Sequence, residues 1–544
     1  MKIVEYLLNR LKENNATDIF GIPGGVVLDF LYTADRIEGI TPYLSYHEQA
    51  AAFEAVGYAQ VNHTLGVAYA TRGPGFTNLI TGIADAYAES VPVLFITGHS
   101  GKAVEHSMRF EKEQELDTVS MVRCITKYAS VIDKAEDCWK IDKAINTALF
   151  GRKGPVLLDF SDEVWEKDVV NTIEIECEKK VDNKNSKDFS CFKRFLKEAR
   201  RPVILVGDGI RQSGTYESLN ILLNIAKMPV LSSRGSQDVA AGNEYYFGYI
   251  GSHGIRYANM IFDKADLVIA LGNRLAFPIA SETYKRSLEG KRLVQIEIES
   301  SEIKSSIPNL TSLVCNLDIA IDKLKNFNYH DYTSWIETCN IIKQELAHAD
   351  INIIVSALSK KLQSITPDTV VVCDVGNNEF WTSRAYEFAS VKNRILYSKS
   401  FGSLGCGLPK AIGATINTGR PILLIVGDQG LQINIQELQF VKQHNLPIEI
   451  VVVNNHASGM IEDREKKKYG YELHTTRETG YEPINIKDVV CAYGIRFRNI
   501  KLPTVSEITS SSYIPLEPCI PNGNKMYDMS PTLDELKIKY LEHL

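Results

Sequence analysis

Short apolar runs that end in glycine, asparagine or aspartate recur along the chain and predict buried strands. They are rich in Val and Ile and lack polar alternation, as in strands covered on both faces of a parallel sheet. The clearest runs are residues 92–98, 201–209, 265–273, 368–378, 421–430 and 447–455. Helical stretches lie between them, for example at 48–60, 77–90 and 433–444. This alternation predicts an α/β fold of doubly wound parallel sheets, with ligands at the carboxyl ends of the strands.

Two polar stretches divide the chain into domains. Residues 176–190 are polar and charged, and residues 326–346 are polar and irregular, with no strand-like run. We therefore predict three domains, at 1–170, 185–330 and 345–544. The length agrees with this division, because 544 residues at about 150 per domain give roughly three or four domains. No internal repeat indicates a solenoid.

Composition excludes several classes of protein. Hydrophobic residues make up 44% and charged residues 23%, which is ordinary for a globular protein. The net charge of −7 does not favour nucleic-acid binding, which usually requires an excess of basic residues. No apolar run approaches the length of a membrane span, and Glu5, Asn9 and Arg10 interrupt the apolar run at the start, so we expect neither a span nor a signal peptide. The 10 cysteines form no Cys-x-x-Cys pair, so we expect reduced thiols in a cytoplasmic protein.

The strongest chemical signal follows two strand runs of the third domain. Gly427-Asp428-Gln429-Gly430 follows one run, and Asn454-Asn455 ends the next, with 24 residues between Gln429 and Asn454. Adjacent parallel strands would bring this carboxylate and carboxamide to the same sheet edge. They are hard oxygen ligands of the kind that Mg²⁺ accepts together with substrate phosphates. The neighbouring glycines would let phosphate oxygens approach the N–H groups at a helix start.

This spacing resembles the thiamine-diphosphate binding motif, and the chain as a whole resembles the acetolactate synthase group of thiamine-diphosphate enzymes. The similar segments occur in the same order through all three domains. They are FGIPGG (20–25), YHEQAAAFEAVGYA (46–59), the segment 71–98, QELDTVSMVRCITKYA (114–129), GYIGSHG (248–254), ADLVIALGNRL (265–275), SLGCGLPKAIGA (403–414) and NIQELQ (434–439). The resemblance implies a pyrimidine-binding, a central and a diphosphate-binding domain.

The resemblance also implies roles for individual residues. Glu48 would be the acid that hydrogen-bonds the aminopyrimidine ring of the cofactor, and Gln114 would lie near the reacting carbon. Asp428 and Asn455 would bind Mg²⁺ by side chain, and Ala457 by its carbonyl. The other positions implied to contact the cofactor are Gly24, Gly376, Asn377, Asn378, Leu404 (as an apolar wedge), Gly427, Gln429, Gly430 and Met460.

The resemblance further implies that the first domain of one subunit faces the third domain of another. Glu48 and Asp428 lie in those two domains, so each half of the site would be incomplete alone. We therefore expect a homodimer or homotetramer.

Several positions depart from the family pattern. Gln429 replaces the second glycine of the metal motif, and Asn377-Asn378 replaces Gln-His. In the flavin-side segments, Ala276 and Leu317 each replace an Asp, and Pro278 replaces the Arg that orients the acceptor, so FAD binding is left open. Arg464 stands at the position of a tryptophan that orients the acceptor, which favours an acceptor larger or more polar than pyruvate, although its segment also reads as a solvated helix face.

We therefore expect decarboxylation of a 2-oxo acid, most plausibly pyruvate, and transfer of the acyl-anion equivalent to a carbonyl acceptor. The segment IPNGNKMYDMSP (520–531) resembles related enzymes that act on nucleotide-activated keto sugars. The absence of a His-His pair from the first domain favours carboligation over simple decarboxylation. Three alternatives stay open: an acetolactate synthase, a non-ligating decarboxylase or lyase, and a non-catalytic binding protein.

Overall fold

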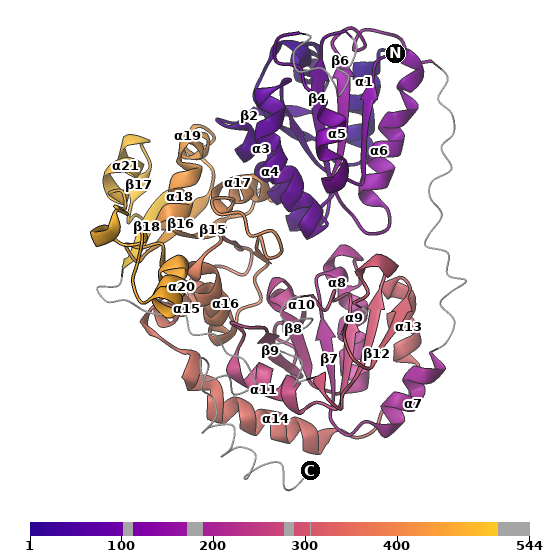
Figure 1. Ribbon diagram of the computed structural model, residues 1–544, viewed down its shortest axis with the longest axis vertical. Helices are drawn as coiled ribbons and strands as arrows, with labels where there is room; N and C mark the ends of the chain where they lie inside the picture. The colour runs from indigo at the N-terminus through magenta and orange to yellow at the C-terminus, as the bar shows by residue number, and fades with distance from the viewer. Residues whose placement is uncertain (102–111, 171–188, 277–287, 305, 510–544) are drawn as a thin grey trace. The chain divides into compact units, whose positions relative to one another are not determined.

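A computed structural model describes residues 1–101, 112–170, 189–276, 288–304 and 306–509. They form three six-stranded parallel sheets with associated helices (Figure 1), which confirms the predicted α/β class. The chain divides into two compact units: one contains the first sheet and the third sheet apart from Ile395, and the other contains the second sheet. Residues 176–188, Pro278 and the segment 520–531 lie outside the described residues.

The first sheet has the strand order β2-β1-β3-β4-β6-β5. Its strands are β1 (Asp18–Gly21), β2 (Thr41–Leu44), β3 (Gly66–Tyr69), β4 (Val93–His99), β5 (Tyr128–Ile132) and β6 (Val156–Ser161). Its helices are α1 (Ile3–Glu13), α2 (Leu28–Arg36), α3 (Glu48–Asn62), α4 (Pro74–Glu89), α5 (Thr118–Val122) and α6 (Trp139–Leu149). Neighbouring strand residues point to opposite faces, so Ile19 packs in a core with α1, α2 and α6, and Phe20 in a core with α3 and α4.

The second sheet has the order β12-β11-β10-β7-β8-β9. Its strands are β7 (Pro202–Val206), β8 (Val230–Ser233), β9 (Tyr246–Ile250), β10 (Leu267–Leu271), β11 (Arg292–Glu297) and β12 (Leu310–Val314). The helices of this part of the chain are α7 (Ser190–Glu198), α8 (Gly209–Gln212), α9 (Tyr216–Ala226), α10 (Gln237–Ala240), α11 (Arg256–Lys264), α13 (Leu317–Lys325), α14 (Thr333–Leu346) and α15 (Ile353–Gln363). Two hydrophobic cores again cover the two faces of the sheet.

The third sheet has the order β14-β13-β15-β16-β18-β17. Its strands are β13 (Val370–Cys373), β14 (Ile395–Leu396), β15 (Ile422–Gly427), β16 (Ile448–Asn454), β17 (Arg496–Phe497) and β18 (Thr504–Thr509). Its helices are α16 (Asn377–Ala389), α17 (Gly407–Thr418), α18 (Asp428–Ile433), α19 (Leu438–Gln443), α20 (Gly459–Tyr469) and α21 (Ile486–Ala492). None of the described helices is long and apolar enough to cross a membrane.

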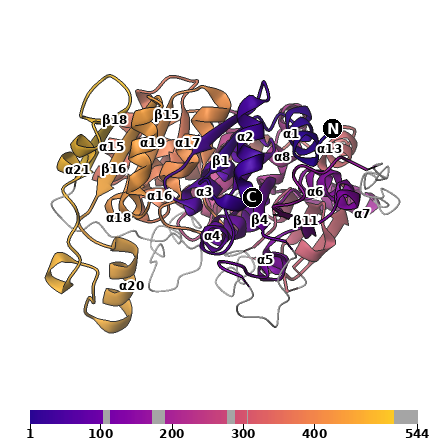
Figure 2. The same cartoon turned by 90° about the horizontal axis from the view of Figure 1, so that it is seen from above.

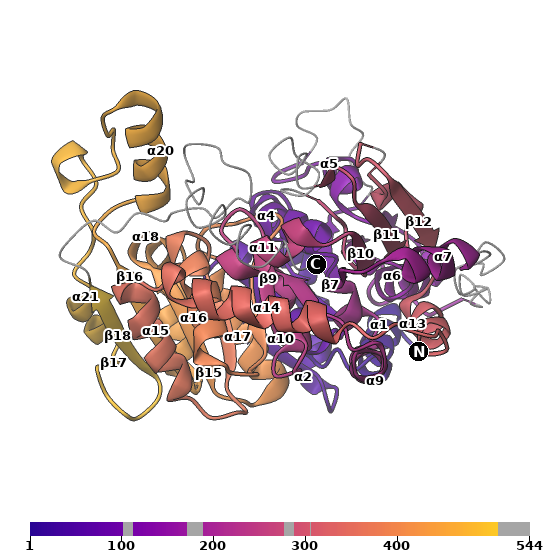
Figure 3. The same ribbon diagram turned by 90° about the horizontal axis from the view of Figure 1, so that it is seen from below.

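Each of the six apolar runs overlaps an observed strand, but the prediction that residues 326–346 are irregular was wrong. Residues 333–346 form α14, which packs against α11 (Figure 3). Trp335, Cys339, Ile342 and Leu346 recur at helical spacing and are buried in the core of the second sheet. The helical period was present among many polar residues, and the search for strand-like runs missed it. The predicted domain boundaries stay predictions.

Close packing of α3 against α17 joins the first and third sheets within their unit (Figure 2). A Cβ at Gly413 would lie 1.8 Å from the Glu54 carbonyl oxygen, and a Cβ at Gly57 would lie 2.2 Å from the Lys410 carbonyl oxygen. The two backbones therefore approach as closely as glycine permits. Lys410 is itself buried and forms an ion pair of 2.7 Å with Asp85 of α4.

Two glutamates are buried together in the same unit. Glu54 of α3 accepts a hydrogen bond from the Ser45 hydroxyl, and Glu437 accepts one from the Tyr46 backbone N–H at 3.1 Å. Burial raises the pKa of both carboxyl groups, that of Glu437 to about 7, and the negative charge of Glu437 raises the pKa of Glu54 further. The pair therefore retains a proton that two exposed glutamates would lose.

This pair predicts a specific pH dependence of stability. The unfolded chain holds these glutamates at a pKa of about 4.3, so between that value and about 7 the folded state binds more protons than the unfolded state. The free energy of unfolding therefore decreases as pH rises through this range, by at most about 1.4 kcal/mol per pH unit for each proton. Thermal unfolding from pH 5 to 8 should show a shallower decrease in Glu54→Gln than in the wild type. An exposed control, Glu38→Gln, should follow the wild type, and equal slopes in all three proteins would contradict the assignment.

Candidate functional site

Three strand ends of the third sheet bring the predicted metal and phosphate residues together. Strand β15 pairs with β13 on one side and with β16 on the other. The strand-to-helix turns at the ends of these strands, which run into the first residues of α16, α18 and α20, carry residues 376–378, 427–430 and 455–460. All three turns therefore lie at the carboxyl edge of the sheet, where doubly wound folds bind ligands.

Two asparagine amides converge at Gly459, the first residue of α20. A Cβ at Gly459 would lie 2.4 Å from Asn455 Nδ2 and 2.9 Å from Asn377 Nδ2. Asn377 is buried, and its Oδ1 has no hydrogen-bond partner within the described residues. Asn378 instead donates from Nδ2 to the Asp374 carbonyl at 2.8 Å, which fixes the turn after β13. The site thus contains the buried Oδ1 of Asn377 and a space beside the amides of Asn377 and Asn455, which a residue larger than glycine at position 459 would fill.

Asp428 begins α18 and is buried. The Tyr481 hydroxyl donates to its Oδ2 at 2.7 Å, and burial raises the pKa of this carboxyl group against the opposing effect of that hydrogen bond. Ala457, in the turn after β16, is also buried. Asp428, Asn455 and Ala457 would offer a carboxylate, a carboxamide and a carbonyl oxygen, which is a donor set of the kind that suits Mg²⁺.

The displaced glycine of the metal motif has a local physical explanation. A Cβ at Gly430 would lie 2.0 Å from Asp374 Oδ2, so the turn needs glycine at this position. The side chain of Gln429 does not meet this carboxylate, and its Oε1 accepts a hydrogen bond from the Ser458 hydroxyl at 3.2 Å. Gln429 therefore links the turn after β15 to the turn after β16.

Leu404 lies half-buried in the turn that precedes α17. The next residue, Gly405, has a φ of +86°, and its carbonyl accepts a hydrogen bond from Asn434 Nδ2 at 2.8 Å. A Cβ at Gly405 would lie 2.6 Å from the side chain of Ile433 in α18. The Leu404 turn is therefore packed directly against the helix that Asp428 begins.

A second cluster lies in the first domain, around residues 71–75. Glu48 is half-buried at the start of α3, and Asn78 Nδ2 donates to its Oε2 at 2.9 Å. The Oε1 atom of Glu48 lies 3.3 Å from the position of a Cβ at Gly75. A Cβ at Gly24 would lie 2.5 Å from Thr71 Oγ1, so Gly24 adjoins the same segment.

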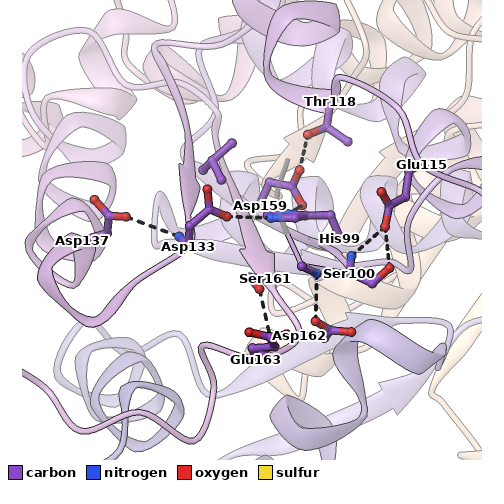
Figure 4. Close-up of polar contacts among 12 residues, drawn as sticks. His99, Ser100, Glu115, Thr118, Asp133, Asp137, Asp159, Ser161, Asp162 and Glu163 are labelled. Carbon is purple, nitrogen blue, oxygen red and sulfur yellow. Dashed lines mark hydrogen bonds and ion pairs between the residues drawn. The ribbon is translucent and has the colours of Figure 1, made fainter. Parts of the chain in front are cut away.

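Gln114 borders this cluster through its backbone. It is exposed, has a φ of +60°, and places its carbonyl oxygen 2.3 Å from the position of a Cβ at Gly73. The neighbouring Glu115 is buried and accepts hydrogen bonds from the Ser100 backbone N–H at 2.9 Å (Figure 4) and from Arg72 at 3.1 Å. These contacts hold the Gln114 backbone beside the Gly73 turn.

Next to this segment, His99 connects the ends of strands in the first sheet (Figure 4). Its Nε2 lies 2.7 Å from Asp133, and its Nδ1 lies 3.4 Å from Asp159. Hydrogen bonds and charge from these two carboxylates raise the pKa of His99, although burial opposes them. Asp159 also accepts a hydrogen bond from Thr97 at 3.1 Å.

The structure does not unite all predicted residues. Glu48 and Asp428 belong to separate clusters, and no hydrogen bond joins them. Met460 and Arg464 lie one turn apart on α20, where Arg464 is exposed. Leu317 is buried in a core of the second sheet, and its Cδ1 lies 2.8 Å from the position of a Cβ at Gly272.

Sequence reasoning missed four residues that hold these clusters. The sequence did indicate a possible role for Asp374, because this residue lies at the end of an apolar strand run, close to predicted site residues. Tyr481 carried none, since it lies 53 positions after its partner Asp428. Asn78 and Glu115 lie within family-like segments, but their contacts depend on the tertiary fold.

Comparisons with known proteins find matches in all three parts of the chain. Models of the thiamine pyrophosphate enzyme N-terminal TPP binding domain, central domain and C-terminal TPP binding domain match residues 1–121, 191–324 and 374–510. The acetolactate synthase large subunit of Lactococcus lactis is 30% identical over 513 residues, covering 92% of this chain and 88% of that protein. The acetolactate synthase isozyme 2 large subunit of Escherichia coli is 28% identical over 557 residues, covering 99% and 96%.

The contact between Gly430 and Asp374 predicts unequal effects of two neighbouring substitutions. Gly430→Ala would force a methyl group against the Asp374 carboxylate and should lower the free energy of unfolding by about 1–3 kcal/mol. Gln429→Ala loses only one hydrogen bond to Ser458 and should cost about 1 kcal/mol or less. Denaturant unfolding of the ligand-free protein measures both. Equal stability of Gly430→Ala and the wild type would contradict the close approach.

Proposed function

The chain belongs to the acetolactate synthase-like group of thiamine pyrophosphate enzymes, and from this premise we propose that it decarboxylates pyruvate and transfers the acyl-anion equivalent to a carbonyl acceptor other than a second pyruvate. The observation that carries the cofactor part of the proposal is the convergence of Asn377, Asp428 and Asn455 at one edge of the third sheet. When bound, thiamine diphosphate supplies the carbanion chemistry that these reactions require.

The third-sheet edge fits a diphosphate and a divalent cation. We propose that Asp428, Asn455 and the Ala457 carbonyl hold Mg²⁺. The turns at Gly376–Asn378 and Gly427–Gly430, with Leu404 and Met460, would hold thiamine diphosphate. The buried Oδ1 of Asn377 lacks a partner among the described residues, and the donor set consists of hard oxygens, as Mg²⁺ prefers. Tyr481 keeps the Asp428 carboxylate oriented through its hydroxyl group.

In the first domain, Glu48 would hydrogen-bond the aminopyrimidine ring of the cofactor and hold a proton on it. Asn78 donates to one carboxyl oxygen of Glu48, which leaves Oε1 for this contact. Gln114 would lie beside the reacting carbon, and Gly24 would line the same pocket. The positions of Gly24, Glu48 and Gln114 around residues 71–75 support a common site.

A second copy of the chain would complete each site. Phe401 and Ile433 are large apolar side chains, about two-fifths exposed or more, in the segments that carry Leu404 and Asp428. Exposed apolar side chains of this kind favour coverage by another subunit. We propose a homodimer or homotetramer in which Glu48 of one copy serves the third-sheet site of another.

Arg464 carries the acceptor part of the proposal. It is exposed on α20, one turn beyond Met460, in a helix with a mixture of acidic and basic residues. A charged side chain at the position of the acceptor-binding tryptophan favours an acceptor larger or more polar than pyruvate, and a nucleotide-activated keto sugar meets that description.

The names of the relatives favour a second candidate, an acetolactate synthase that uses pyruvate as both donor and acceptor. The two candidates differ in the reaction product and in whether the purified protein has the colour of a bound flavin. The purified protein should be incubated with thiamine diphosphate, Mg²⁺ and pyruvate, with and without a panel of keto sugars and aldehydes. Release of CO₂ that depends on an acceptor, with an adduct whose mass equals that of the acceptor plus C₂H₄O (pyruvic acid less CO₂), supports the proposal. Acetolactate from pyruvate alone and a flavin absorption spectrum support the synthase, and free acetaldehyde supports a simple decarboxylase.

Replacement of Glu48 tests the catalytic assignment. Glu48→Gln keeps the shape of the side chain but removes the acid, and should lower kcat by at least about 100-fold. Binding of thiamine diphosphate with Mg²⁺ should change far less, because the diphosphate contacts lie in the third domain. CO₂ release and calorimetric titration measure the two effects, with Glu38→Gln as an exposed control. A Glu48→Gln enzyme with wild-type kcat would exclude the assigned role.

A further inference from the structure

Asp374 is a buried carboxylate at the centre of the third-sheet edge, and it has no contact with solvent. It directly follows β13, and its side chain is 0% exposed. Its backbone N–H donates to the Ile425 carbonyl of β15 at 2.9 Å, and its own carbonyl accepts the Asn378 amide at 2.8 Å. The backbone of Asp374 is therefore fixed by the sheet on one side and by the asparagine turn on the other.

Both carboxylate oxygens of Asp374 hold the turn that carries Leu404. Oδ1 accepts the Gly407 backbone N–H at 2.9 Å, and Oδ2 accepts the Gly405 backbone N–H at 3.2 Å. Gly407 is the first residue of α17, so its N–H has no partner within that helix. A carboxylate that accepts two such N–H groups fixes both the position and the orientation of the turn.

The same carboxylate also meets the metal turn. A Cβ at Gly430 would lie 2.0 Å from Asp374 Oδ2, and one at Gly405 would lie 3.3 Å from the Gly430 carbonyl oxygen. Asn434, just after α18, donates to the Gly405 carbonyl at 2.8 Å and joins the two turns a second time. Asp374 thus lies where the asparagine, Leu404 and Asp428 turns meet.

We propose that Asp374 is a positioning residue for the cofactor site, which holds the Leu404 turn in register with the turn that carries Asp428. This inference rests on the proposed function of those two turns. Asp374 does not touch the cofactor; it acts through the N–H groups of Gly405 and Gly407. Burial raises its pKa to about 6, and these two hydrogen bonds oppose that rise, so the carboxylate form is retained at neutral pH.

The test is calorimetric titration of full-length protein with thiamine diphosphate at saturating Mg²⁺ and neutral pH. Asp374→Asn keeps the side-chain size but turns an NH₂ group toward one of the two N–H donors. We expect its dissociation constant to rise about 10- to 100-fold, as for residues that orient direct ligands. Asp159→Asn is the matched control: Asp159 is also buried and accepts hydrogen bonds from threonines, but it lies in the first sheet. The control should bind the cofactor like the wild type.

A double-mutant cycle separates positioning from general destabilisation. If Asp374 acts through the Leu404 turn, its effect on the dissociation constant should largely disappear in a Leu404→Ala background, whereas independent effects would multiply. If Asp374→Asn does not fold, Asn434→Ala replaces it and should weaken binding several-fold through the same turn. If Asp374→Asn binds thiamine diphosphate with wild-type affinity, or if the effects of Asp374→Asn and Leu404→Ala on the dissociation constant simply multiply, the positioning role of Asp374 is overturned and the proposed function still stands. A wild-type protein that binds no thiamine diphosphate would instead overturn the proposed function.

Discussion

The backbone contact between α3 and α17 is the constraint on which the first unit depends. Gly57 and Gly413 let the two helices approach until a Cβ on either would overlap a carbonyl oxygen of the other. Such contact leaves no room for side chains, so the polar groups near it must be paired within a dry interior. The ion pair of Lys410 with Asp85 and the proton held by Glu54 and Glu437 meet that requirement. The first and third sheets are thereby held in one unit.

Within that unit, the chemistry lies at strand ends and helix starts. Glu48 begins α3, Asp428 begins α18, and Leu404 immediately precedes α17. Each of these positions exposes unpaired backbone N–H groups, which attract carboxylates and phosphates. Asp374 occupies one such place with a protein carboxylate. The diphosphate of the cofactor would occupy another in the neighbouring turns.

Local patterns in the sequence were sufficient for the strands, the α/β class and the metal motif. Apolar runs such as 421–430 predict strands because burial on both faces requires them to be apolar throughout. Helix α14 was missed because its buried positions are separated by polar residues. The role of Tyr481 was not predictable, since its partner is set by the fold, and the position of Asp374 after a strand run did not show which N–H groups it would hold. Gln429 looked like a defect in the motif, and only the space around Gly430 shows why the glycine has moved.

Calorimetric titration of thiamine diphosphate into the full-length protein, with and without Mg²⁺, tests the central claim most directly. We expect saturable binding by the wild type that requires Mg²⁺, and a dissociation constant at least about tenfold higher in Asp428→Ala. Binding that is independent of Mg²⁺, or equal affinity in Asp428→Ala and the wild type, would contradict the assignment of the third-sheet edge as the site that binds the diphosphate and the metal.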